Sequence, residues 1–264
     1  MLDRNEIEVF RDRDNYGPVV VTEDALSRTL YFGTHSKQSR MLINQPAIPI
    51  LRYSQAMLLG LHFVPNPKRV LFLGLGGGSL VKFFLKHVPG CAITVVELRQ
   101  KVIDVAHAFF AVPESHPALT IVNQNALDFL SAVTPASFDV VLVDIFDAFG
   151  PAEELTQKQF LRRCLAATTS DGLLVFNSWI RGPGHTPPLI KALKKNSDHE
   201  LFNLFLGDYN SNVVTYCFKK EFALQGYGPT KQALLLRSAD WALDLAPLFD
   251  LLWEQNTLGV DAIY

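Results

Sequence analysis

The chain has 264 residues, of which 48% are apolar, and its 24 Lys and Arg against 26 Asp and Glu residues leave a net charge of −2 at pH 7. This composition excludes an intrinsically disordered chain and supplies enough apolar side chains for one large domain or two unequal ones. Because neutralising a phosphate backbone requires a basic surface, the charge balance also argues against nucleic acid as a partner.

The number and spacing of the cysteines bear on metal binding, and the lack of targeting patterns bears on the cellular compartment. Cys91, Cys164 and Cys217 match no metal-ligand spacing and are too few for a disulfide framework. The first residues are charged, and no stretch approaches the roughly 18 apolar residues of a membrane span. We therefore expect a cytoplasmic protein with no metal and no membrane partner.

The first 68 residues carry short β-rich runs. Pro18–Thr22 and Thr29–Phe32 are separated by a polar turn, which predicts one or two hairpins in a small sheet. Residues 54–63 have apolar side chains at nearly helical spacing and end before Pro65. We therefore predict an N-terminal β-rich domain with a linking helix over residues 1–68.

From Arg69 onward, apolar strands alternate with helices, which is typical of a parallel sheet buried on both faces. The strands are predicted at Arg69–Leu73, Ala92–Glu97, Leu119–Val122, Phe138–Val143 and Leu173–Phe176. The helices are predicted at Leu80–His87, Lys101–Phe110 and Thr156–Ala167. The predicted fold class is thus α/β, with a doubly wound, mostly parallel Rossmann-like sheet over residues 69–264 behind the small N-terminal β-hairpin domain.

The C-terminal part of the chain adds two strands and a helical tail to this sheet. The closing strands are predicted at Leu201–Leu206 and Asn212–Phe218, and the pattern permits one of them to be antiparallel. The tail from about Lys220 has apolar residues at helical intervals, with a second helix beginning at Pro247. We expect the tail to pack against its own domain, with a subunit interface as the alternative.

A glycine-rich loop directly follows the first parallel strand. Its sequence, Leu73-Gly-Leu-Gly-Gly-Gly-Ser-Leu80, places Gly74, Gly76 and Gly78 between a buried strand and a helix. Glycines let the backbone approach a ligand closely, and the helix offers free N–H groups. A dinucleotide fingerprint would require Gly or Ala where Ser79 stands, so the spacing favours a loop that binds S-adenosyl compounds.

Side chains after the next two strands complete the predicted nucleoside site. Glu97, followed by Leu98, ends the second strand, where a carboxylate can accept both ribose hydroxyls of an adenosine. Asn125 and Ala126 follow the third strand, where an amide oxygen can read the adenine amino group. NAD remains an alternative ligand at this point. The alternative for Glu97 is a solvated residue at a strand end, and for Asn125 an ordinary turn residue.

Two carboxylates, Asp144 and Asp147, follow the fourth strand. Because ligands bind beyond the carboxyl ends of such strands, we expect Asp144 near the sulfonium end of an S-adenosyl ligand. Paired carboxylates attract a cationic amine, and one of them can remove its proton. The alternative is that Asp144 binds loop amides and Asp147 caps a helix. Trp179, after the fifth strand, is a candidate either for an acceptor pocket or for core packing.

Taken together, these motifs resemble the spermidine synthase (aminopropyltransferase) family, and more closely its bacterial spermidine-synthase-like members. The resemblance extends from about Tyr16 to Phe218. It includes the glycine loop, Gln38-Ser39, Tyr53-x-Gln55-x-Met57, Val96-Glu97-Leu98, Asn125-Ala126, Asp144-x-x-Asp147 and Leu155-Thr156. It implies a class I methyltransferase-type Rossmann domain joined to a small β domain in a dimer or tetramer, and we predict a homodimer.

The resemblance also implies a reaction, the transfer of an aminopropyl group from decarboxylated S-adenosylmethionine to a polyamine or related amine. By this resemblance Glu97 binds the ribose, Asn125 the adenine and Gln38 the chain beyond sulfur. Asp144, helped by the Tyr53 hydroxyl, orients and deprotonates the attacking amine. Asp147 and Gln55 are the side chains that the resemblance implies in acceptor binding, and Trp179, from its place after a strand, is a further candidate.

Three positions depart from the family pattern. Ser79 stands where the family has an Asp that binds the donor ammonium, Gln55 replaces a Glu, and Ala148 replaces a Pro. Each change removes negative charge or rigidity from the amine site. We therefore expect altered donor or acceptor specificity, or loss of aminopropyl transfer. The alternatives are a methyltransferase that uses ordinary S-adenosylmethionine, a non-catalytic nucleoside-binding scaffold and, less favoured because of Ser79, a nicotinamide oxidoreductase.

Overall fold

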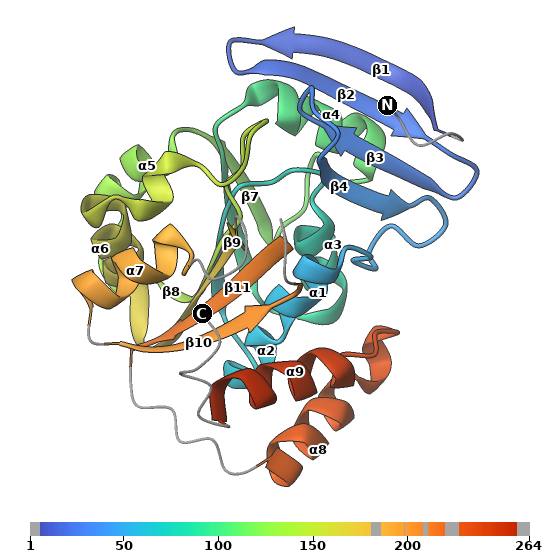
Figure 1. The fold of residues 1–264 in the computed structure, drawn as a ribbon. Helices are drawn as coiled ribbons and strands as arrows, with labels where there is room; N and C mark the ends of the chain where they lie inside the picture. The colour runs from blue at the N-terminus through green and yellow to red at the C-terminus, as the bar shows by residue number, and fades with distance from the viewer. Residues whose placement is uncertain (1–5, 181–185, 198, 208–210, 220–226, 258–264) are drawn as a thin grey trace.

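The computed structural model describes residues 6–180, 186–197, 199–207, 211–219 and 227–257. Two sheets organise these residues, a four-stranded antiparallel sheet near the N-terminus and a seven-stranded, mostly parallel sheet (Figure 1). This arrangement confirms the predicted α/β class with a small N-terminal β sheet.

The N-terminal sheet is an antiparallel meander. Its strands, in spatial order, are β1 (Ile7–Asp14), β2 (Gly17–Glu23), β3 (Ser27–Tyr31) and β4 (Lys37–Leu42). Val19, Val21 and Leu30 lie on one face and pack against Phe110 of helix α4 (Gln100–Phe110). The predicted hairpin is confirmed as β2–β3. The flanking strands β1 and β4 were not predicted, because their many charged residues obscure the apolar alternation.

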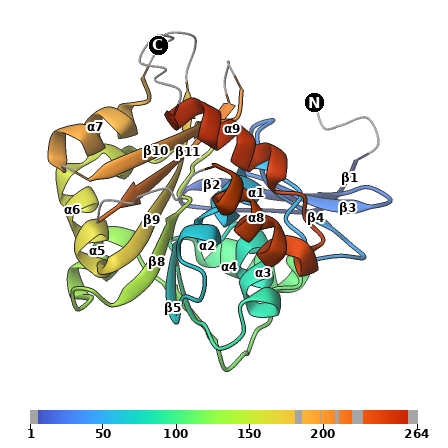
Figure 2. The ribbon, with the colours of Figure 1, turned by 90° about the horizontal axis from the view of Figure 1, so that it is seen from below.

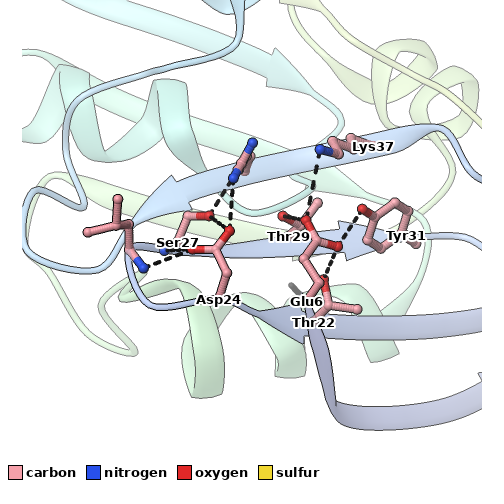
Figure 3. Close-up of polar contacts among 9 residues, drawn as sticks. Glu6, Thr22, Asp24, Ser27, Thr29, Tyr31 and Lys37 are labelled. Carbon is pink, nitrogen blue, oxygen red and sulfur yellow. Dashed lines mark hydrogen bonds and ion pairs between the residues drawn. The ribbon is translucent and has the colours of Figure 1, made fainter. Parts of the chain in front are cut away.

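The opposite face of this sheet holds a buried carboxylate, Glu6 (Figure 3). Its Oε2 accepts hydrogen bonds from the hydroxyls of Thr22 and Tyr31, both at 2.8 Å, and its Oε1 accepts one from Thr29 at 3.3 Å. Lys37 Nζ lies 3.8 Å from Oε1. A buried carboxylate is costly unless it is paired, so these partners explain how Glu6 is accommodated.

The seven-stranded sheet has the order β10-β11-β9-β8-β5-β6-β7. Its strands are β5 (Arg69–Leu73), β6 (Ala92–Glu97), β7 (Leu119–Asn123), β8 (Phe138–Val143), β9 (Thr168–Ile180), β10 (Glu200–Phe205) and β11 (Ser211–Phe218). The first five of these pair in parallel, whereas β11 is antiparallel to both of its neighbours. The antiparallel strand that the pattern permitted is therefore β11.

Helices cover both faces of the large sheet (Figures 1 and 2). One face carries α1 (Arg52–Leu58), α2 (Gly60–Phe63), α3 (Ser79–His87), α8 (Tyr227–Ser238) and α9 (Ala246–Thr257), and the other α5 (Ala126–Ala132), α6 (Lys158–Ala167) and α7 (Pro188–Asn196). Val70 and Phe72 join the first core layer, while Leu71 and Leu73 join the second. This two-sided burial explains the continuous apolar strands. Helix α5 was not predicted.

The turn from β5 into α3 requires glycine at its first position. Gly74 has a φ of +99°, and a Cβ atom there would lie 2.2 Å from the carbonyl oxygen of Asp144. Glycine therefore allows the ends of β5 and β8 to approach each other closely. This close approach brings Asp144 next to the glycine loop.

The tail contains the expected pair of helices, although its start at Lys220 lies outside the described residues. Helix α9 packs along β10, where Asn256 Nδ2 donates to Asn203 O at 2.9 Å and Gln255 Oε1 accepts from Phe205 N–H at 2.9 Å. The described part of the tail thus packs against its own domain. Across the described ranges, no helix combines the length and apolar character needed to cross a bilayer.

Candidate functional site

A cavity of about 650 Å³ lies where strands β5, β6 and β8 end. Gly74, Glu97 and Asp144 line it from the large sheet, while Gln38 and Tyr53 line it from the N-terminal segment. Small-molecule sites usually measure about 300–1,000 Å³ and lie at this edge of open α/β sheets. The cavity therefore has the place and the size of a ligand site.

Most of the residues predicted from the sequence line this cavity. They are Gln38, Tyr53, Gly74, Gly76, Glu97, Leu98, Asn125, Ala126, Asp144, Asp147 and Trp179. Gly78, Ser79 and Gln55 are not among the lining residues: Gly78 is the N-cap of α3, Ser79 is the first residue of that helix, and Gln55 Nε2 donates to Pro49 O at 2.9 Å. The ligand contacts expected of these three residues stay predictions.

Glu97 lies at the end of β6 and is held by backbone amides. Its Oε2 accepts from Leu75 N–H at 2.9 Å and its Oε1 from Arg99 N–H at 2.9 Å. The side chain is buried, and burial raises its pKa above the ordinary value for glutamate. Each carboxylate oxygen can accept more than one hydrogen bond, so both remain available to a pair of ligand hydroxyls.

The glycine loop is fixed by two side chains whose contacts with it were not predicted from the sequence. Gly77 N–H donates to Ser39 Oγ at 2.8 Å, which ties the loop to β4. Lys82 is buried beneath the loop, and its Nζ donates to Gly77 O at 2.8 Å and to Phe110 O at 2.5 Å. Burial lowers the pKa of Lys82 to about 7. A lysine in an amphipathic helix gives no sign of such burial, because its partners are distant in sequence.

Asn125 sits between β7 and α5 and caps that helix. Its Oδ1 accepts from Leu127 N–H at 2.8 Å and from Asp128 N–H at 3.3 Å. The amide oxygen, which was expected to read the adenine amino group, is thus engaged by the helix. The NH₂ group is the part of this side chain that remains available to a base.

Asp144 follows β8 and is surrounded by side-chain donors. Asn177 Nδ2 donates to Asp144 Oδ1 at 2.8 Å, and Asn177 Oδ1 in turn accepts from Asn212 Nδ2 at 2.9 Å. The Tyr53 hydroxyl lies within hydrogen-bonding reach of both this carboxylate and Gln38 O, 3.2 Å away. Burial outweighs these donors and raises the pKa of Asp144 to about 6. Asn177 and Asn212 were not predicted, because an Asn in a strand carries no distinctive motif.

Burial and the charge of Asp144 raise the pKa of Tyr53, so its hydroxyl keeps its proton. Two aromatic side chains line the same cavity, Trp179 and Phe146, with ring centroids 5.5 Å apart. Trp179 therefore contributes to the cavity wall. Such a wall can contact the methylene groups of an aliphatic ligand.

Asp147 is exposed and belongs to the loop after β8. Its Oδ1 accepts from Phe149 N–H at 2.6 Å and from Gly150 N–H at 3.0 Å, so it stabilises a loop turn and not a helix. Beyond this loop, the 3₁₀ helix η1 (Glu153–Thr156) brings Glu153 and Glu154 to the cavity. The adjacent glutamates could have been noticed just before the predicted helix at Thr156.

Negative charge exceeds positive charge along the cavity lining. The acidic residues are Glu97, Asp144, Asp147, Glu153 and Glu154, and the basic residues are Lys37, Arg52 and Arg99. At positions 55 and 79 the chain has Gln and Ser where the family pattern has acidic residues. Glu153 and Glu154 bring two other carboxylates to the cavity. Across the described residues, no group of three or more His, Cys, Asp or Glu side chains is arranged to hold a metal ion.

This fold and cavity define an α/β protein with a methyltransferase-type Rossmann-like sheet. Human methyltransferase-like protein 13, solved in complex with SAH, shares the fold with a TM-score of 0.58 and 19% identity, over 80% of this chain and 98% of that one. More specifically, the chain belongs to the spermine/spermidine synthase family, since the model of the spermine/spermidine synthase domain matches residues 52–221.

Relatives in sequence include two bacterial polyamine aminopropyltransferases. The protein of Chromobacterium violaceum is 34% identical over 161 residues, which are 61% of this chain and 61% of that protein. The protein of Neisseria meningitidis serogroup A is 30% identical over 168 residues, 63% of this chain and 64% of that protein. The chain thus spans less than two thirds of the length of these relatives.

Solved structures of spermidine synthases share the fold. A probable spermidine synthase from Corynebacterium glutamicum has a TM-score of 0.72 at 19% identity, covering 86% of each chain. A spermidine synthase in complex with the transition-state analogue AdoDATO has a TM-score of 0.65 at 18% identity, covering 92% of this chain and 88% of that one.

Proposed function

We propose that this chain transfers an aminopropyl group from decarboxylated S-adenosylmethionine to a polyamine or a related small amine. The observation that carries the proposal is a single cavity with a buried carboxylate, Glu97, and a half-buried one, Asp144. Glu97 stands beside the glycine loop, while Asp144 has a pKa of about 6 and is surrounded by Tyr53 and Asn177. The names of the bacterial relatives, polyamine aminopropyltransferases, agree with this assignment.

The nucleoside part of the donor is assigned to the end of the cavity that contains Glu97. Glu97 accepts the ribose hydroxyls, and the NH₂ group of Asn125 donates to a ring nitrogen of adenine. Gly74 and Gly76 let the backbone approach the donor closely. Gln38 contacts the chain beyond sulfur. Leu98 and Ala126 complete the wall around the base.

Asp144 prepares the acceptor amine for attack. It accepts a proton from the amine, whose lone pair then forms a bond to the carbon beside the sulfonium. The carbon–sulfur bond breaks, its electron pair stays on sulfur, and methylthioadenosine leaves as a neutral thioether. Tyr53 keeps its proton and holds the carboxylate in place by a hydrogen bond. Holding the two reactants in line supplies much of the acceleration.

The acceptor is assigned to the end of the cavity that holds Trp179 and Phe146. These rings contact the methylene chain, and a distal ammonium group lies toward Asp147, Glu153 and Glu154. Charge-assisted hydrogen bonds to carboxylates favour a cationic amine over a neutral ligand of the same shape.

Further features of the proposal concern the whole protein. We propose an N-terminal domain over residues 1–68 and a nucleoside-binding domain over residues 69–264. We also propose a cytoplasmic homodimer without nucleic-acid or membrane partners. The composition and the resemblance to the family support these assignments.

Calorimetric titration with three compounds tests the proposed function. We expect methylthioadenosine and decarboxylated S-adenosylmethionine to bind more tightly than S-adenosylmethionine, and the decarboxylated donor to be consumed when putrescine is added. Tighter binding of ordinary S-adenosylmethionine would favour a methyltransferase instead. If none of the three compounds binds, the assignment of the nucleoside site is wrong.

A further inference from the structure

Arg99 joins the two parts of the protein at the nucleoside end of the cavity. Its backbone N–H donates to Glu97 Oε1 at 2.9 Å, and its side chain reaches the N-terminal sheet. There its Nε donates to Asp14 Oδ2 at 2.9 Å and its Nη2 to Asp14 Oδ1 at 2.8 Å. One residue therefore contacts both the carboxylate assigned to the ribose and the hairpin formed by β1 and β2.

The turn of the β1–β2 hairpin reaches the same cavity. Asp14 and Gly17 are paired across the hairpin, so Tyr16 lies in the turn between them. Tyr16 N–H donates to Asp14 Oδ1 at 2.8 Å, and the Tyr16 side chain lines the cavity together with Arg99. In Figure 1 the hairpin lies above helix α4, at whose start Arg99 stands. The orientation of Tyr16 thus depends on the carboxylate that Arg99 holds.

The contact between Arg99 and Asp14 is more buried than a second ion pair between the hairpin and α4. The Arg99 side chain is only 8% exposed, lies 4.5 Å above the Phe32 ring and also donates to Gly17 O at 2.9 Å. Lys101 and Asp12, by contrast, form a pair whose side chains are 32% and 43% exposed. Bidentate buried pairs fix geometry, whereas exposed pairs contribute little.

We propose that the β1–β2 hairpin forms an outer wall of the nucleoside pocket and that Arg99 is the positioning residue that holds this wall beside Glu97. The inference rests on the proposed function, because it assigns the pocket to the nucleoside. It adds a role for the N-terminal sheet in retaining the donor. Breaking the Arg99–Asp14 pair should release the nucleoside faster and leave the amine site unchanged.

The test compares the dissociation rate of methylthioadenosine from the wild type and from five variants. Asp14→Asn and Arg99→Met break the ion pair while keeping the backbone N–H that binds Glu97. Tyr16→Ala removes the Tyr16 side chain from the cavity wall and leaves the Arg99–Asp14 ion pair intact. Because Tyr16 is 57% exposed, the fold should be unaffected. Lys101→Ala is the matched control, because it breaks only the exposed pair on the same hairpin.

We expect the first three variants to release methylthioadenosine about tenfold faster, as expected for loss of a charge-assisted contact or of the wall it holds. The KM for the donor should rise by a similar factor, while kcat and the KM for the amine stay unchanged, which a general loss of folding would not produce. Arg99→Lys should restore part of the affinity. Lys101→Ala should behave as the wild type.

Two results would overturn the inference in distinguishable ways. If the wild type binds methylthioadenosine but Asp14→Asn and Tyr16→Ala release it at the wild-type rate, the hairpin is not a wall of the pocket and the proposed function stands. If the wild type does not bind methylthioadenosine at all, the proposed function fails and this inference fails with it.

Discussion

Replacement of Asp144 by Asn should give a protein that is more stable than the wild type and nearly inactive. Asn177 Nδ2 donates to Asp144 Oδ1 at 2.8 Å, and an asparagine keeps that acceptor. Its new NH₂ group can donate to the Tyr53 hydroxyl oxygen. The substitution therefore preserves the shape and the hydrogen bonds of the site but removes its charge.

The stability change follows from the sign of the pKa shift. The folded pKa of Asp144 is about 6 against an ordinary value of 3.8, so ionisation costs folding free energy above pH 6. The full shift of about two pKa units corresponds to about 3 kcal/mol, and partial solvent access reduces this to on the order of 1–2 kcal/mol. The cost disappears as the pH falls from about 6 toward 4. Asp144→Asn should thus raise the free energy of unfolding at pH 7.5 and leave it unchanged near pH 4.

The catalytic change follows from the loss of the proton acceptor. General bases contribute about 10²- to 10⁴-fold to rate, so kcat should fall within that range. In the wild type, kcat/KM should decline below pH 6, because only about one tenth of Asp144 is ionised at pH 5. The variant should lose this acid limb while binding methylthioadenosine normally.

Urea denaturation at two pH values and chromatographic measurement of released methylthioadenosine check both changes. Two results would refute the reasoning. One is turnover in Asp144→Asn at the wild-type rate with the acid limb intact. The other is a loss of nucleoside affinity as large as the loss of rate, which would place Asp144 in donor binding.

Three further substitutions, one of them with a matched control, test other parts of the site. Glu97→Gln should weaken binding of methylthioadenosine by about tenfold or more in calorimetry, because charge-assisted bonds to the ribose become neutral ones; unchanged affinity would remove Glu97 from the nucleoside site. Gly74→Ala should destabilise the protein by more than about 2 kcal/mol in urea, since its Cβ would lie 2.2 Å from Asp144 O. Gly90→Ala is its control, because Gly90 has a positive φ but no atom lies within 4 Å of an added Cβ; it should cost only the backbone strain, about 1–2 kcal/mol. Equal losses of stability in the two variants would show that the contact with Asp144 O is unimportant. Asn177→Leu should move the acid limb of kcat/KM to higher pH by about one unit, because the carboxylate of Asp144 loses a donor; an unshifted limb would leave Tyr53 as the only relevant partner.

The residues at strand ends were predictable because the carboxyl ends of parallel strands meet at one edge. The runs Arg69–Leu73, Ala92–Glu97 and Phe138–Val143 are strands with those bounds in the structure. Once these strands were identified, Glu97 and Asp144 had to lie at the same edge of the sheet. Apolar continuity and the glycine loop were sufficient for this part of the site.

The residues that reach the site from elsewhere could not be predicted in the same way. Ser39 binds Gly77 N–H across 38 positions of sequence, and Lys82 meets Phe110 O across 28. These contacts depend on how the N-terminal sheet and α4 pack against α3, and no local pattern reports that packing. Ser79 shows the opposite case: a motif position suggested a ligand contact, whereas the residue begins α3 and is not among the lining residues of the cavity, so that contact stays a prediction.

The carboxylates of Glu97 and Asp144 differ in what holds them, and this difference suits them to separate tasks. Backbone amides hold Glu97 at 2.9 Å on each oxygen, and such donors are fixed in direction by the chain and do not act as acids near neutral pH. Side chains hold Asp144, and its pKa of about 6 lies close to neutral pH. A rigid, permanently bonded carboxylate can bind hydroxyls without taking part in proton transfer, whereas a carboxylate with a pKa near the working pH can accept a proton and release it again. The division of roles between donor binding and amine activation therefore follows from which donors the fold places around each carboxylate.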